Sequence, residues 1–170
     1  LRPQSLIENS NLTVDGDGKV TVSATDYAGG FSGAMANAYA VNNTISATAA
    51  VSTDKSHAGG FTGFASVGWG LELGTDDGAG ELLSIVGVNP SVILGTQMKG
   101  SFTVKAGGDY AGGLVGEGSG TVIGDSSQDH LQNLTFWKYN NPRGLPQQRS
   151  TAINGLESVS AGGSYAGGIA

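Results

Sequence analysis

A seven-residue, glycine-rich segment occurs four times along this chain, the last time without its seventh residue. Its first occurrence is Tyr27-Ala28-Gly29-Gly30-Phe31-Ser32-Gly33, and closely similar stretches occupy 57–63, 110–116 and 165–170. We call these four stretches the corner segments. Self-similarity of this kind is typical of architectures in which each unit packs on its neighbours, so the recurrence constrains the fold more than any other feature of the sequence.

The residues before the corner segments predict strands. Runs of alternating small apolar and hydroxyl residues occupy 20–24, 102–106 and 159–161, and period-two alternation with β-branched residues is typical of a strand with one face inward. The glycine pair should then form a corner, through positive φ or through close approach of another backbone, and the next apolar residue should point into a core. These expected structural residues are Gly29, Gly30 and Phe31, Gly59, Gly60 and Phe61, Gly112, Gly113 and Leu114, and Gly167, Gly168 and Ile169.

The spacing of the corner segments predicts how they stack. Their first residues are separated by 30, 53 and 55 positions, and the two longer intervals are close to twice a coil of about 27 residues, within the range of stacked repeats. This predicts degenerate coils near 82–87 and 134–137. The predicted fold is all-β: a β-solenoid resembling a parallel β-helix, with a β-sandwich built from duplicated units as the alternative. We expect residues 1–170 to be one solenoid segment, a fragment of a longer protein, with an irregular insertion at about 125–155.

One corner segment resembles a known family. Gly113-Leu114-Val115-Gly116 is a literal instance of the motif that names the GLUG-motif repeats, and 30–33 and 60–63 resemble aromatic variants of it. Such repeats occur in large secreted and cell-surface proteins of bacteria, including adhesin-like proteins and the non-catalytic regions of some surface peptidases. The resemblance implies an extracellular, bacterial cell-surface repeat protein, and it carries over no catalytic residue.

Composition excludes several classes of function. The net charge of −6 argues against binding to nucleic acid, which requires clustered cations, and against electrostatic attachment to anionic membranes. No run of apolar residues is long enough for a transmembrane helix, so we expect no membrane insertion. Charged residues make up 13% of the chain, against roughly 25% in ordinary globular domains, which suits tightly turning β-structure.

Chemistry-bearing residues are sparse. The chain has no Cys and two histidines, which leaves little for nucleophilic catalysis or a zinc site, and His57 stands where the other corner segments have Tyr. Asp15 and Asp17 lie in a glycine-rich loop that can bind Ca²⁺ but lacks the further ligands of an EF-hand, so a plain turn is favoured. We predict no catalytic residue, no metal site and no cofactor.

Aromatic residues in the expected insertion are the candidates for ligand binding. Phe136, Trp137 and Tyr139 cluster there beside Arg143, and Trp69 stands in an earlier strand. Rigid aromatic faces can stack on sugars or anchor a protein partner, or they can instead cover a flank of the core.

The function predicted from these features is a non-catalytic structural or adhesive module, a rigid stalk with a contact surface. Its expected partners are a host or cell-surface protein or glycan, and neighbouring repeats of the same polypeptide. The alternatives are a glycan-binding module and a polysaccharide-degrading β-helix enzyme.

Overall fold

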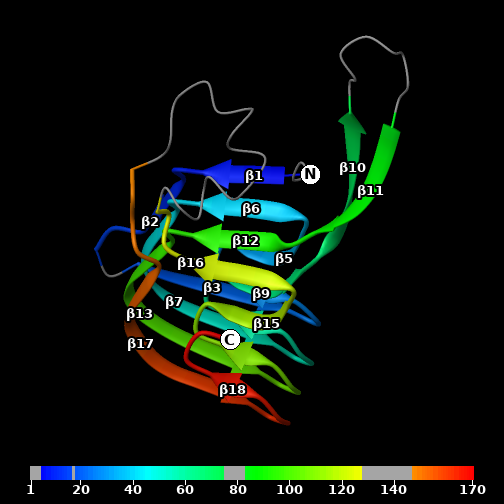
Figure 1. Ribbon diagram of the computed structural model, residues 1–170. Coiled ribbons are helices and arrows are strands. Elements are labelled where there is room, and N and C mark those ends of the chain that lie inside the picture. The colour runs from blue at the N-terminus through cyan, green and yellow to red at the C-terminus, as the bar shows by residue number, and fades with distance from the viewer. Residues whose placement is uncertain (1–4, 17, 75–82, 128–146) are drawn as a thin grey trace.

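The computed structural model describes residues 5–16, 18–74, 83–127 and 147–170 (Figure 1). These residues form strands and no helix, which confirms the predicted all-β class. The strands are β1 (Ser5–Glu8), β2 (Asn11–Thr13), β3 (Lys19–Ala24), β4 (Ala28–Gly29), β5 (Ser32–Ala36), β6 (Ala38–Val41), β7 (Thr44–Thr53), β8 (Ala58–Gly59), β9 (Thr62–Ser66), β10 (Gly68–Gly74), β11 (Leu83–Asn89), β12 (Ser91–Leu94), β13 (Gln97–Ala106), β14 (Ala111–Gly112), β15 (Val115–Ser119), β16 (Thr121–Gly124), β17 (Ala152–Ala161) and β18 (Ala166–Gly167).

Most strands belong to four parallel sheets in which equivalent parts of the sequence lie side by side. The sheets have the orders β1-β6-β12-β16, β17-β13-β7-β2 with β3 also on β7, β18-β14-β8-β4, and β15-β9-β5. In Figure 1 the strands of the first sheet lie one above another from β1 to β16, and β17 and β18 lie at the opposite end from β1. We call this arrangement the stack.

Successive corner segments pair directly with one another. Ala58 pairs with both Ala28 and Ala111, and Ala111 pairs with Ala166. No strand lies between neighbouring corner segments, so the predicted halving of the two long intervals into extra coils is wrong. Residues 83–87 of the coil expected near 82–87 instead belong to β11, which pairs antiparallel with β10 and extends away from the stack (Figure 1). Residues 134–137 lie outside the described residues.

The core lies inside the stack, where apolar side chains form columns. Phe31, Phe61, Leu114 and Ile169 form the column expected from the sequence: Phe61 and Leu114 are fully buried, Phe31 is partly buried, and Ile169 at the end is 57% exposed. The Phe31 and Phe61 rings stack with centroids 4.9 Å apart. Two further columns follow the long sheet in register: Leu12, Ile45, Met98 and Ile153, then Val20, Ala49, Phe102 and Leu156.

Positive φ occurs at the corners, but at positions other than the glycine pairs. In the last three corner segments the leading residue adopts it, with φ of 67° at His57, 58° at Tyr110 and 59° at Tyr165. The expectation that the glycine pair supplies positive φ is therefore wrong, whereas the expected close approach is observed. A Cβ at Gly60 would overlap the carbonyl oxygen of Gly113, the next glycine along the stack.

Residues 32–41 form two strands, β5 and β6, which are separated by Asn37. Asn37 has a φ of 47°, in the left-handed region, and this conformation turns the chain between the two strands. Asn adopts the left-handed conformation more readily than most residues. The corner after β6 is similar, because Asn42 has a φ of 54° and Gly95, which follows the neighbouring β12, has a φ of 62°. These corners separate the four sheets from one another.

Candidate interaction surfaces

Most of the aromatic residues predicted to bind a ligand cannot be placed. Phe136, Trp137, Tyr139 and Arg143 lie outside the described residues, and Trp69 belongs to β10, where only the backbone is described. Their role in ligand binding stays a prediction. Most of the expected insertion at about 125–155 also lies outside the described residues, and β17, which pairs with β13, begins at Ala152.

Polar contacts hold both ends of this insertion against the stack. The Arg149 guanidinium donates to the carbonyl oxygen of Asn42 and to Oγ1 of Thr44, both at 2.8 Å. The backbone N–H of Ser126 donates to the carbonyl oxygen of Arg149 at 2.8 Å, and Ser126 itself is buried. Ser126, after β16, and Arg149, before β17, therefore lie side by side, next to the corner that follows β6.

An aromatic ladder runs along the corner segments on the outside of the stack. Neighbouring ring centroids are 4.7 Å apart for Tyr27 and His57, 5.1 Å for His57 and Tyr110, and 5.2 Å for Tyr110 and Tyr165. The interplanar angle falls to 4° for the last pair, and Tyr165 is 71% exposed. Tyr165 is thus the last ring of the ladder among the described residues, with Tyr110 stacked on one of its faces.

The carboxylate of Glu117, which the sequence analysis did not single out, interacts with this ladder. Nε2 of His57 lies 2.7 Å from Oε2 of Glu117. Glu117 occupies the register position of Phe64 in the neighbouring strand, and the Phe64 ring packs edge-on against His57 at 5.5 Å. Two features of the sequence could have indicated this interaction: position 57 has His where the other corner segments have Tyr, and Glu117 directly follows the third corner segment.

The charge of Glu117 should be measurable at Tyr110. The nearby Glu117 carboxylate, followed by burial and by the charges of Tyr165 and Asp109, raises the pKa of Tyr110, because a negative charge disfavours the phenolate. We expect Glu117→Gln to lower the Tyr110 pKa towards its ordinary value, as followed by NMR titration of ring-labelled tyrosines. Tyr39 is the internal control, because burial raises its pKa and Glu117→Gln should leave that pKa unchanged. An unchanged Tyr110 pKa would contradict this assignment.

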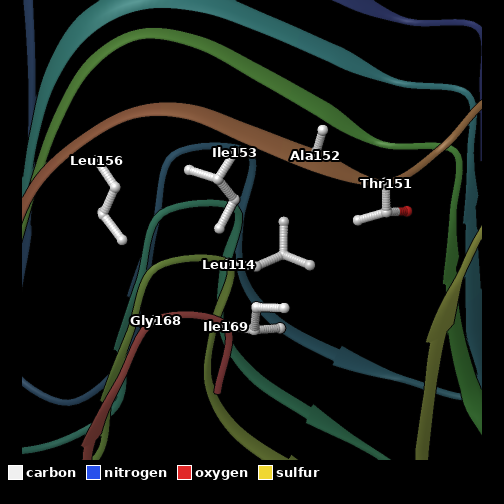
Figure 2. Close-up of a pocket in the computed structure, with 7 residues that line it drawn as sticks. All are labelled: Leu114, Thr151, Ala152, Ile153, Leu156, Gly168 and Ile169. Atoms are coloured by element: carbon white, nitrogen blue, oxygen red, sulfur yellow. The ribbon is translucent and has the colours of Figure 1, made fainter.

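The C-terminal end of the stack is an apolar opening. A cavity of about 290 Å³ lies there, and Figure 2 shows Leu114 and Ile169 from the corner column beside Ile153 and Leu156 from β17. Thr151, Ala152 and Gly168 complete the lining. Leu114, Ile153, Leu156 and Ile169 each belong to an interior column of the stack, so the core is exposed at this opening.

A second, more polar hollow lies on the outer face of the long sheet. It has a volume of about 160 Å³, and its lining includes Lys19, Thr48, Ser101 and Glu157. The Ser101 hydroxyl donates to the Glu157 carboxylate. Glycoside hydrolysis normally uses two carboxylates flanking the scissile bond, whereas Glu157 is the only carboxylate among the described residues of this lining.

The described residues contain no group of three or more His, Asp or Glu side chains that could hold a metal ion. Asp15 lies in the exposed turn between β2 and β3, next to Gly16 with a φ of 66°, and Asp17 lies outside the described residues. The described part also has no helix long and apolar enough to cross a membrane.

Comparison with known proteins adds no identity to these surfaces. No family model, no curated protein and no solved structure matches the chain.

Proposed function

We propose that this chain is a β-solenoid segment acting as a non-catalytic structural and adhesive module. The observation that carries the proposal is the in-register, parallel pairing of the four corner segments. A unit of this length cannot bury its apolar residues alone, and stacking against neighbours supplies a continuous core. Phe61 illustrates the point, because its ring is fully buried between the equivalent residues Phe31 and Leu114.

The parallel pairing favours a solenoid over the alternative β-sandwich. Sandwiches are built from antiparallel sheets joined by hairpins and Greek-key connections. Here the only antiparallel pair among the described residues is the β10–β11 hairpin, which projects from the stack (Figure 1). A hairpin inserted into one turn leaves the pairing of β9 with β15 intact, as expected of an insertion in a stacked repeat.

The geometry suits a stalk. The backbone hydrogen bonds between corner segments are directed along the axis of the stack. A stalk built from such units would therefore be held together along its length. Insertions on one flank are where repeat proteins often carry their contacts, and the sequence predicts such an insertion at about 125–155. Together with the resemblance to GLUG-motif repeats, these features support a role at the bacterial cell surface, outside the cell, with a host or cell-surface protein or a glycan as partner.

The location is tested by labelling intact cells of the source organism with an antibody raised against this chain. We expect labelling without permeabilisation, and loss of the signal after brief protease treatment of the intact cells. A cytosolic protein of the same cells is the control and should be labelled only after permeabilisation. Labelling of this chain only after permeabilisation would contradict the proposal.

The absence of catalysis is tested separately. Turnover of an acidic polysaccharide by the purified chain, abolished by Glu157→Gln, would favour the enzyme alternative. Ser101→Ala is the matched control for this variant, because it removes the hydrogen bond to Glu157 and keeps the carboxylate. We expect no turnover by any of the three proteins.

A further inference from the structure

Positive charge is gathered on one face of the stack. This face is the outer face of the long sheet, which is formed by β2, β3, β7, β13 and β17. Of the five Lys and Arg residues that the structure describes, four lie on or beside this face: Lys19, Lys99, Lys105 and Arg149. We propose that the face binds an acidic polysaccharide, an inference that rests on the proposed function for the choice of a glycan as partner.

Strand alternation places the lysines on the outside. Lys99 follows the buried Met98, and Lys105 follows the buried Val104. Successive residues of a strand point to opposite faces of the sheet, so both lysines point away from the core. They are exposed, as is Lys19 on β3.

Carboxylates are nearly absent from this face. Glu157 is its one carboxylate among the described residues, and the others lie in turns and loops or in other sheets. The face is therefore net positive in a chain whose net charge is −6. No ion pair joins its lysines to a described carboxylate. These charges are free to meet an anionic partner, and complementary potentials steer such an encounter and fix its orientation.

Protection of a strand edge does not explain these lysines. Lysine is common on edge strands, where it discourages pairing with another chain. Lys99 and Lys105 instead belong to β13, which pairs with β7 on one side and with β17 on the other. They therefore present their charge from the middle of the sheet.

The spacing of the lysines fits an extended ligand. Lys99 and Lys105 are six residues apart on β13, which corresponds to about 20 Å at the rise of a strand. Lys19 lies on β3, separated from β13 by β7, which adds about 10 Å across the sheet. The three cations cannot converge on one small anion, whereas a linear polymer with regularly spaced acidic groups can contact all of them.

The uncharged part of the face suits sugar hydroxyls. The outward positions of β7 are mostly Ser and Thr, and the lining of the hollow of about 160 Å³ includes Thr48, Ser101 and Thr103. Such hydroxyl groups both donate and accept hydrogen bonds, as the hydroxyl groups of a sugar do.

Two other polyanions fit this face less well. None of the exposed large apolar side chains lies on the long sheet, whereas attachment to a membrane surface usually buries apolar residues in the lipid. No aromatic residue occupies an outward position of its strands, whereas single-stranded nucleic acid is bound by stacking of bases on aromatic rings.

Binding is measured by biolayer interferometry with the purified chain. The acidic probes are polygalacturonate, which carries carboxylates, and heparin, which also carries sulfates; the neutral controls are fully methyl-esterified polygalacturonate and dextran. We expect binding to one or both acidic polymers and to neither control. Raising the salt concentration from about 50 to about 200 mM should weaken this binding by about tenfold or more, because each phosphate-like charge neutralised by a lysine releases counterions.

Charge variants locate the site. Lys99→Gln and Lys105→Gln should each weaken binding by about fivefold, the factor expected for one cation near an anionic surface. Combining both with Lys19→Gln should abolish it. Glu157→Gln should strengthen binding by about twofold or more, because it removes a negative charge that repels the polymer. The circular dichroism spectra should be unchanged, because all four positions are exposed.

Lys55→Gln is the matched control. It removes the same charge from the turn after β7, where the Lys55 amine lies 3.3 Å from Oδ1 of Asp26. Because this lysine is outside the face and already paired, its loss should change the affinity by less than about twofold, as expected for a screened surface charge. An equal loss of affinity in Lys55→Gln and Lys99→Gln would show that net charge alone governs binding and would overturn the proposed site.

Two further results would overturn the proposal. One is the absence of binding to both acidic polymers. The other is tighter binding to double-stranded DNA than to either of them, which would assign the face to nucleic acid. Neither result bears on the location of the chain, because the antibody labelling of intact cells tests that independently.

Discussion

Replacing Gly60 by alanine is expected to lower the free energy of unfolding by about 3 kcal/mol, at the upper end of typical overpacking costs. The added Cβ would overlap the carbonyl oxygen of Gly113 and the Cε atom of Met98. Met98 can move by a change of rotamer, but the Gly113 backbone is held by its own hydrogen bond to Gly167 at 3.1 Å. Relief of the overlap therefore requires separation of two paired corner segments. Urea denaturation followed by circular dichroism measures the change.

Gly168→Ala is the matched control for this substitution. It makes the same chemical change at the same position of the last corner segment, where the added Cβ meets nothing within 4 Å. We expect a change within about 0.5 kcal/mol, as for most surface substitutions. Equal costs at Gly60 and Gly168 would show that the corner segments do not pack against one another in this way.

The strands and the interior column could be predicted because they depend on local pattern. Alternation at 20–24 and 102–106 lies within β3 and β13, and the apolar residue after each glycine pair lies in one column because the recurrence of the corner segments sets its position. Burial in β7 alternates along the strand, as period-two patterning requires.

The number of turns could not be predicted, because two different arrangements fit the same spacing. An interval of 53 residues is compatible with two short turns or with one turn of about 30 residues that carries an insertion, since both fall within the range known for repeats. Residues 83–89 have the composition of a strand in either case. Only the pairing partner distinguishes them, and β11 pairs with β10 rather than with another turn of the stack.

The geometry of the corners also lay beyond local reasoning. Propensity assigns positive φ to glycine, because a bulky side chain is strained in that region. The structure places Tyr110 there and uses the glycines for clearance between segments. The interaction of Glu117 with His57 was missed for a related reason: it depends on the register between separate strands, and the sequence does not display that register.

Truncating Phe61 should have a still larger effect than changing Gly60. Phe61 is fully buried within the corner column, stacked on Phe31 with centroids 4.9 Å apart. Its loss leaves a void between two backbones that cannot close, because the N–H of Phe61 donates to Leu114 while its carbonyl oxygen accepts from Phe31, both at 2.9 Å. Phe61→Ala is therefore expected to cost about 3–5 kcal/mol, as for other buried aromatic truncations. Urea denaturation measures this cost.

Two further variants test whether the cost of Phe61→Ala comes from the burial of an apolar side chain. Ile169→Ala truncates the same column at its end, where the side chain is 57% exposed, and should cost less than about 1 kcal/mol, since full burial of such a side chain contributes about 1.5–3 kcal/mol. Phe61→Leu should recover part of the loss of Phe61→Ala, because Leu114 fills the same position one segment further along the stack. If Phe61→Ala and Ile169→Ala cost the same, the interior column would not be what stabilises the stack; if Phe61 is the more costly by several kcal/mol, each segment owes its stability to having a neighbour on both sides.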